Sequence, residues 1–519
     1  MTGGLRQRMA WLHTWTGLWV CWLAFAIFLT GTLSVFVHPI SDWMRPEQAQ
    51  EHREVRYTEP LDHSQQLKHG LRYLQQHAAD SKMWELWPRA GEAEFQVFWL
   101  NEHGYYQDAH LSTATGEALP EEVSKVRDTL GGTHFVTFHH ELHAGLTGLW
   151  IVGAASAAML VALISGVITH KRIFQDFFTF RPAKGQRSWL DAHNLAGVLT
   201  LPFLFMIVYS GLAISWSTYM PAVSWAQELR TGDTAHVREY GPENKPTGRA
   251  GVLTPLDPLV RQAEATFRTP AFAVVVNHPG DAAMSVDVYS TNTPATQQGK
   301  LLSKRGVMKF NGVTGAVLSI DMPHRAPPNG ARATMATLDD LHRLQFAGAV
   351  IRWIYFVAGM AGTAMMATGA LLFMVKRRKK ALNEFGAATQ RVYRLIEVLN
   401  VATIAGLCLA CIGFLWANRL LPLKLEERHE WEVAAFFAVW LLALVHACLR
   451  RPALAWREQL WTGAAMCLLL PLLNLATTGQ HVLGYLAQRD IERAAVELTA
   501  IGIGVLLAFA AKAARKAAS

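Results

Sequence analysis

Long apolar segments recur along the whole chain, separated by polar ones. Eight of them reach about 20 residues or more, the length needed to cross a hydrocarbon layer roughly 30 Å thick. They lie near residues 12–37, 146–169, 192–216, 348–375, 398–417, 431–449, 459–478 and 498–514. The pattern predicts an all-α polytopic membrane protein with about eight transmembrane helices.

Two long polar segments, 38–138 and 217–341, interrupt this series. Each combines a helix-like stretch, strand-like runs and a Thr-Gly turn. The helix-like stretches are 65–78 and 256–267, and the strand-like runs are 82–88, 94–100, 271–277 and 284–290. Each segment therefore predicts a small α+β domain. Because each domain stands between two spans, the first four spans and the two domains form one unit duplicated in parallel.

The expected domain plan follows from these boundaries. Residues 1–37 hold the first span, 139–216 the second and third, 342–375 the fourth, 376–397 a basic linker and 398–519 a four-helix membrane extension. The extension lacks the histidine pattern described below, so we expect it to be dispensable for binding a cofactor.

Composition and charge agree with this topology. The chain is 51% hydrophobic, has 18 tryptophans and carries a formal net charge of +8. Its basic residues gather at alternate ends of the spans, as in the run from Lys376 to Lys380. This bias places that side and both termini in the cytoplasm and the two large segments outside it. The lipid bilayer is the expected partner. No nucleic acid is expected, since binding one would need a basic face on a folded domain.

A histidine–glycine pattern occurs twice along the first four spans. His13 is followed by glycines 4 and 18 residues later, at Gly17 and in Thr30-Gly31, and His193 by glycines at the same intervals, at Gly197 and in Ser210-Gly211. The next span of each half repeats a second pattern. His139 and His342 are each followed by glycines 6 and 27 residues later, the latter in Ser165-Gly166 and Thr368-Gly369. Each of the four histidines is expected at the start of a membrane helix.

This pattern suggests two haem sites. Imidazole is a nitrogen ligand that suits iron, and small residues let a backbone or a flat porphyrin approach closely. Gly17 and Gly197 follow their histidines by one helical turn and share their face. His13 and His193 both begin outward-going helices, whereas His139 and His342 both begin inward-going ones. Only histidines at the same depth in the membrane can share an iron atom. The sequence therefore predicts one bis-histidine site near each membrane face, with these four histidines as iron ligands.

Two alternatives stay open for these residues. His143 lies four residues beyond His139, so either could be the outer ligand. The histidines could also be interfacial residues, and the glycines contacts between packed helices.

The cofactor and its electron donor follow from what the chain lacks. No C-x-x-C-H motif is present, so two b-type haems bound non-covalently are expected. No inward loop contains a strand, glycine-rich loop and helix in succession, so no built-in NAD(P)H or flavin domain is expected. The donor is then a quinol or a separate electron-donor protein.

Four strings resemble the PepSY-associated transmembrane family. They are Leu12-His13-x-Trp15-x-Gly17, His139-x-x-Leu142-x-x-Gly145, Leu190-Asp191-x-His193-Asn194 and Leu341-His342. The family contains iron-regulated inner-membrane reductases of ferric siderophores. The resemblance covers about residues 5–380. It implies a bacterial inner-membrane location, periplasmic PepSY-like domains and haem-bearing helical cores.

The expected function is therefore that of a di-haem oxidoreductase. It would carry electrons across the membrane to a periplasmic ferric siderophore or similar iron complex and release Fe(II). Two alternatives belong to other classes: a transporter of iron chelates or other small solutes, and a non-enzymatic PepSY sensor or assembly protein. No catalytic residue beyond the haem ligands is indicated.

Overall fold

The computed structural model describes residues 4–47, 63–89, 93–101, 106–119, 127–170, 186–220, 245–291, 305–323, 330–344, 346–380 and 384–518. The chain divides into two compact units. We call residues 1–49, 126–215 and 349–519 the membrane unit, and residues 50–125 and 216–348 the sheet unit.

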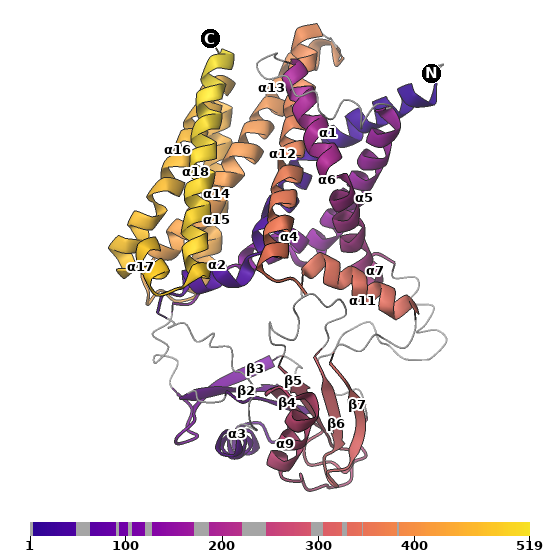
Figure 1. Cartoon of the computed structure of the whole chain (residues 1–519), viewed down its shortest axis with the longest axis vertical. Helices are drawn as coiled ribbons and strands as arrows, with labels where there is room; N and C mark the ends of the chain where they lie inside the picture. The colour runs from indigo at the N-terminus through magenta and orange to yellow at the C-terminus, as the bar shows by residue number, and fades with distance from the viewer. Residues whose placement is uncertain are drawn as a thin grey trace. The chain divides into compact units, whose positions relative to one another are not determined.

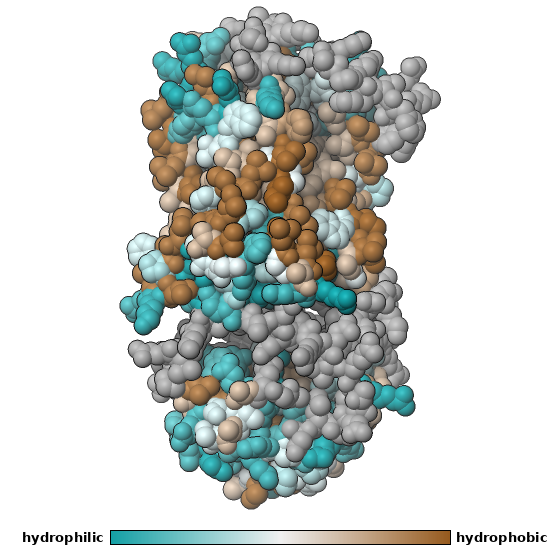
Figure 2. Space-filling model, turned by 60° about the vertical axis from the view of Figure 1, so that its left-hand side comes forward, coloured by the Kyte–Doolittle hydropathy of each residue, from teal (hydrophilic) through white to brown (hydrophobic). Residues whose placement is uncertain are grey.

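Eight described helical segments of the membrane unit are long and apolar enough to cross a membrane. They are α1 (Leu5–Ser34), α5 (Gly145–Thr169), α6 (Gln186–Ile214), α12 (Ala349–Lys380), the continuous series α13 (Thr389–Asn400), η3 (Val401–Ala405) and α14 (Gly406–Leu420), α15 (Arg428–Leu449), α16 (Pro452–Thr478) and α18 (Ile491–Ala518) (Figure 1). Apolar side chains, brown in Figure 2, gather over these helices. The eight expected spans are confirmed, and the chain is a multi-pass membrane protein.

The first four spans form a bundle in which α1 and α6 each pack against both α5 and α12. Helices at equivalent positions of the sequence repeat therefore occupy equivalent positions in the bundle. A single hydrophobic core continues from this bundle into the last four spans; its buried members include Phe25, Phe138, Phe414, Phe436 and Leu470. The extension 398–519, expected as a separate part, shares a core with the repeat.

Short helices lie between the spans, and two of them show that one prediction, that His139 and His342 begin membrane helices, is wrong. The membrane unit contains α2 (Val37–Met44), α4 (Thr133–Glu141), η2 (Gly386–Ala388) and α17 (Val482–Ala487), and the sheet unit contains α7 (Trp216–Tyr219) and α11 (Gly330–Arg343). His139 lies in α4 and His342 in α11, so neither begins a membrane helix. The reason is a break in the backbone: φ is +54° at Leu142 and +55° at Leu344, which ends each short helix before its span.

The sheet unit contains one antiparallel sheet of seven described strands in the order β3-β2-β1-β4-β5-β6-β7. The strands are β1 (Met83–Trp87), β2 (Glu94–Leu100), β3 (Tyr106–Ser112), β4 (Ala271–Asn277), β5 (Ser285–Ser290), β6 (Val307–Asn311) and β7 (Val317–Asp321). Helices α3 (Ser64–His77) and α9 (Leu256–Phe267) pack on one face over a shared core (Figure 1).

This sheet corrects the expectation of two separate domains. Strand β1 of the first polar segment pairs with β4 of the second, with Trp84 opposite Val276. An unpaired edge strand exposes a row of backbone donors and acceptors, and joining two such edges satisfies both rows. The first polar segment is also shorter than the predicted domain 38–138, because α2 and residues 126–138 belong to the membrane unit.

Candidate functional site

His13 of α1 is held against α5 by two contacts. Its Nδ1 lies 2.8 Å from the carbonyl oxygen of Ala162. Its ring lies against Gly166, where a Cβ would come within 3.0 Å of the imidazole Cε1. A carbonyl oxygen can only accept, so Nδ1 carries the proton and Nε2 of the neutral ring keeps its lone pair.

His193 of α6 makes the same contacts with α12. Its Nδ1 donates to the carbonyl oxygen of Met365 at 2.9 Å. A Cβ on Gly369 would lie 3.1 Å from its Cε1. In both cases the accepting carbonyl belongs to the residue four positions before the glycine. The sequence repeat is therefore reproduced as a repeated contact between neighbouring helices.

His139 forms a third copy of this contact. Its Nδ1 donates to the carbonyl oxygen of Ile27 in α1 at 2.8 Å, and a Cβ on Gly31 would lie 2.5 Å from that nitrogen. Burial lowers the pKa of His139, which keeps the ring neutral, the form that binds a metal. About 27 Å of α1 separate Gly31 from His13, at 1.5 Å per residue, so the two sites lie near opposite ends of the bundle.

The Ser/Thr-Gly pairs of the sequence now have a structural role. Glycine provides the space that the imidazole fills. The preceding hydroxyl is bonded inside its own helix: Ser165 donates to Val161 and Ala162, and Thr30 to Ala26 and Ile27. The sequence analysis had assigned these small residues to the approach of a backbone or a porphyrin. The structure shows that Gly31, Gly166 and Gly369 accommodate a histidine from another helix.

His13 and His193 come together in the bundle. Their ring centroids are 6.3 Å apart and their planes are inclined by 57°. Two imidazoles on opposite sides of one metal ion would place their centroids about 6 Å apart, since each metal–nitrogen bond is about 2 Å long. The described residues contain no group of three or more His, Cys, Asp or Glu side chains that could hold a bare ion. Two facing imidazoles suffice for haem, whose porphyrin supplies the other iron ligands.

The two glycines one turn beyond these histidines differ in their surroundings. A Cβ on Gly17 would meet no atom within 4 Å, whereas one on Gly197 would lie 3.2 Å from the sulfur of Met365. Gly17 thus leaves space beside His13 that a flat ligand can use. The donor set, the free face of α1 and the fixed tautomers fit a bis-histidine haem.

The structure does not test the predicted outer ligand pair. His342 belongs to the sheet unit, whereas His139 belongs to the membrane unit, so their pairing stays a prediction from the repeat. His143 is placed differently from His139. It has a φ of +53° beyond the end of α4, and its Nε2 lies 3.0 Å from Nδ1 of His134. His139, rather than His143, shares the environment of His13 and His193.

His134 has a structural role. It is fully buried, its ring stacks on Phe414 at 4.0 Å and on His143 at 4.9 Å, and burial lowers its pKa to about 3. Phe414 belongs to α14, so the histidine pair joins α4 to the last four spans.

A buried ionic network joins the same parts. Arg428 and Glu432 of α15 form a fully buried ion pair, and Glu432 accepts a hydrogen bond from Thr129 at 2.5 Å. Trp43 of α2 donates to Glu497 of α18 at 3.1 Å. These bonds show that the last four spans hold both ends of the first polar segment.

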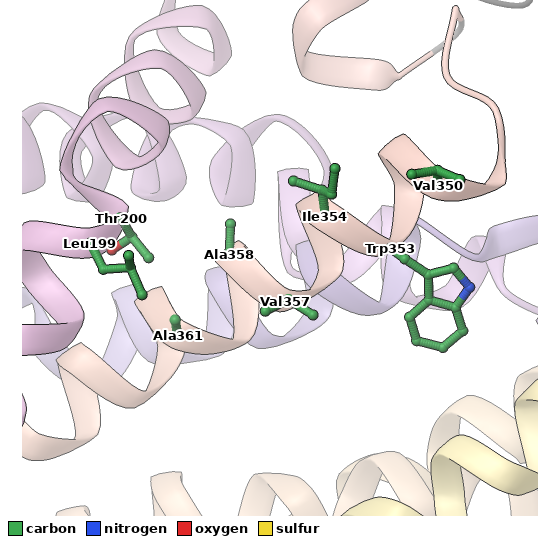
Figure 3. Close-up of a pocket in the computed structure, with 8 residues that line it drawn as sticks. All are labelled: Leu199, Thr200, Val350, Trp353, Ile354, Val357, Ala358 and Ala361. Atoms are coloured by element: carbon green, nitrogen blue, oxygen red, sulfur yellow. The ribbon is translucent and has the colours of Figure 1, made fainter.

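An apolar groove of about 540 Å³ lies between α6 and α12. Figure 3 shows its lining: Leu199, Thr200, Val350, Trp353, Ile354, Val357, Ala358 and Ala361. The hydroxyl of Thr200 donates to the carbonyl oxygen of Ala196. The groove thus offers hydrocarbon contacts and no charged side chain, which suits lipid acyl chains better than a polar substrate.

Comparison with known proteins identifies the family. The model of the PepSY-associated TM region matches residues 10–376, from α1 to the end of α12. The chain belongs to this family. It is also similar to the protein PA4219 of Pseudomonas aeruginosa, described as uncharacterized. The two are 23% identical over 338 residues, which cover 60% of this chain and 79% of that protein.

Proposed function

We propose that this family member is a haem-dependent oxidoreductase of the bacterial inner membrane that carries electrons from the cytoplasmic to the periplasmic side. The observation that supports it most directly is the neighbouring pair His13 and His193, with Nδ1 of each ring bonded to a carbonyl oxygen. A second b-type haem would be held by His139. The sequence repeat assigns His342 as its partner.

The chain's own groups would bind and orient the cofactors. Haem, when bound, supplies a one-electron redox centre between two imidazoles. The Nδ1–H bonds to Ala162, Met365 and Ile27 fix the rotation of each ring and leave Nε2 as the nitrogen that could bind iron. Gly166 and Gly369 leave room for the rings of His13 and His193 to pack closely against α5 and α12.

The proposed acceptor is a periplasmic ferric siderophore or a similar iron complex. Hard oxygen ligands favour Fe(III) over Fe(II), so transfer of one electron weakens the complex and releases Fe(II) without breaking the chelator. The proposed donor is a quinol or a separate protein on the cytoplasmic side.

Spectra of the purified protein test the cofactor proposal. Protein from haem-replete cells should show two low-spin haems, and the variants His13→Ala and His193→Ala should each lose the same one. His139→Ala should lose the other. His140→Gln is the matched control, because this exposed ring on α4 is bonded only within its own turn and to the adjacent Glu141. Colourless protein would favour a transporter or a sensor instead.

Oriented vesicles test the direction of electron flow. With reductant supplied on the cytoplasmic face, the protein should reduce a membrane-impermeant ferric chelate on the opposite face. His13→Ala should slow this reduction although it lies at the far end of α1 from His139. An undiminished rate at a normal protein level would refute transfer through both sites.

A further inference from the structure

The face of the sheet opposite α3 and α9 carries a cluster of three aromatic rings. Trp87 of β1 lies 4.6 Å from Phe98 of β2 and 4.9 Å from Phe272 of β4, measured between ring centroids. Phe272 is the extra residue at a β-bulge between Ala271 and Ala273. A bulge redirects the side chain that it inserts, and this one brings the third ring to the cluster.

Two arginines lie over these rings. The guanidinium carbon of Arg305 is 3.5 Å from the centroid of Phe272, and that of Arg89 is 5.7 Å from Trp87 and 5.9 Å from Phe272. The backbone of Arg89 is fixed by the buried Gln66, which accepts from its N–H at 2.8 Å and donates to its carbonyl at 2.7 Å. We call Trp87, Phe98, Phe272, Arg89 and Arg305 the aromatic–arginine cluster.

Among the described residues, no carboxylate forms an ion pair with the arginines of this cluster. Neither guanidinium forms an ion pair with another described residue. The neighbouring carboxylate, Glu85, accepts a hydrogen bond from Nε1 of Trp87 at 2.6 Å. Burial, and then the like charge of Arg89, lower the pKa of Arg305, while Glu85 acts in the opposite direction. Within the described residues, two positive groups beside one negative group leave a net positive charge that an anion would stabilise.

We propose that the aromatic–arginine cluster binds an anionic aromatic metal chelate, one whose metal is held by catecholate or phenolate groups. The aromatic rings of such a ligand can pack against Trp87 and against the guanidinium of Arg305 that covers Phe272, and its anionic oxygens can accept hydrogen bonds from both guanidinium groups. A neutral hydroxamate chelate offers neither feature. This inference rests on the proposed function in that it names the class of iron complex to be reduced.

Gallium complexes test binding without electron transfer, because Ga(III) is not reduced under these conditions. The affinity of the full-length protein in detergent should be measured by calorimetry with three probes: gallium tris-catecholate, which is anionic and aromatic, gallium tris-oxalate, which has the same charge and no ring, and the neutral gallium tris-acetohydroxamate. The catecholate should bind about tenfold more tightly than the oxalate, the gain expected of ring and cation–π contacts. The hydroxamate should bind more weakly than both.

Variants locate the site. Arg89→Gln combined with Arg305→Gln should weaken catecholate binding about tenfold or more. Phe272→Leu should weaken catecholate but not oxalate binding. Arg72→Gln is the matched control, since Arg72 is an exposed arginine of α3 on the other face of the sheet, and it should change neither affinity.

Three outcomes would overturn the proposal. These are equal affinities for catecholate and oxalate, no binding of either, and catecholate binding that survives the double arginine substitution. The haem spectrum of each sample separates this test from that of the proposed function. Protein without haem that still discriminates among the probes would refute the reductase while supporting the cluster as a chelate site.

Discussion

Gly31 tests the role of the Ser/Thr-Gly pairs most directly. In Gly31→Ala the new methyl carbon would lie 2.5 Å from Nδ1 and 2.6 Å from Cε1 of His139, whereas non-bonded atoms approach to about 3.5 Å. The ring must therefore retreat by about 1 Å. That movement stretches the 2.8 Å bond from Nδ1 to the carbonyl oxygen of Ile27 beyond hydrogen-bonding range.

The cost of this movement can be estimated. Loss of a buried hydrogen bond costs about 1 to 3 kcal/mol, and the better helix propensity of alanine returns about 1 kcal/mol. The net loss is about 0 to 2 kcal/mol, and its midpoint of about 1 kcal/mol corresponds to a roughly fivefold weaker affinity for the haem that His139 would hold. Gly166→Ala needs a much smaller shift, because its methyl carbon would lie 3.0 Å from Cε1 of His13. We expect at most about a threefold effect there.

The assay is transfer of haem from each variant to a haem-scavenging protein, followed spectroscopically. Gly31→Ala should release one haem early, and Gly166→Ala should release the other only slightly earlier than the unsubstituted protein. A Gly31→Ala variant that retains both haems with unchanged affinity, or a larger effect of Gly166→Ala, would refute the assignment of these glycines to the histidine rings.

Other predictions follow from the same contacts. Gly17→Ala should lower haem affinity without lowering thermal stability, whereas Gly502→Ala, which also meets no atom within 4 Å, should change neither; equal haem retention in both would remove Gly17 from the site. Burial lowers the pKa of His134 from 6.5 to about 3, so between these values the unfolded chain binds a proton that the folded chain does not, and stability falls as pH falls. Melting curves of His134→Phe from pH 7 to pH 4 should show a pH dependence weaker by up to about 1.4 kcal/mol per pH unit, and unchanged slopes would contradict this origin. Removing residues 398–519 should cost the haem at His139, because Phe414 and Glu432 support α4 and Thr129; a truncated protein that keeps both haems would instead support the autonomy expected from the sequence.

The amino-acid sequence by itself determined the spans and the positions of the histidines. Hydropathy is a local property, so eight apolar segments predict eight membrane helices without knowledge of their neighbours. The equal intervals from His13 and His193 to their glycines can also be read from the residue numbers alone, and they predicted equivalent helices. The bounds of α9 and β4 agree with the predicted 256–267 and 271–277, since amphipathic periodicity is set within each segment.

Only the tertiary structure decided what these residues contact. Three glycines of the Ser/Thr-Gly pairs, Gly31, Gly166 and Gly369, each contact a histidine from a different helix. The spacing of residues within one helix does not predict which residue of another helix packs against them. The joining of β1 to β4 made one sheet from two polar segments, because pairing of edge strands depends on which edges meet. The last four spans lack the repeat yet share its core, since burial of a side chain depends on packing between segments far apart in the chain.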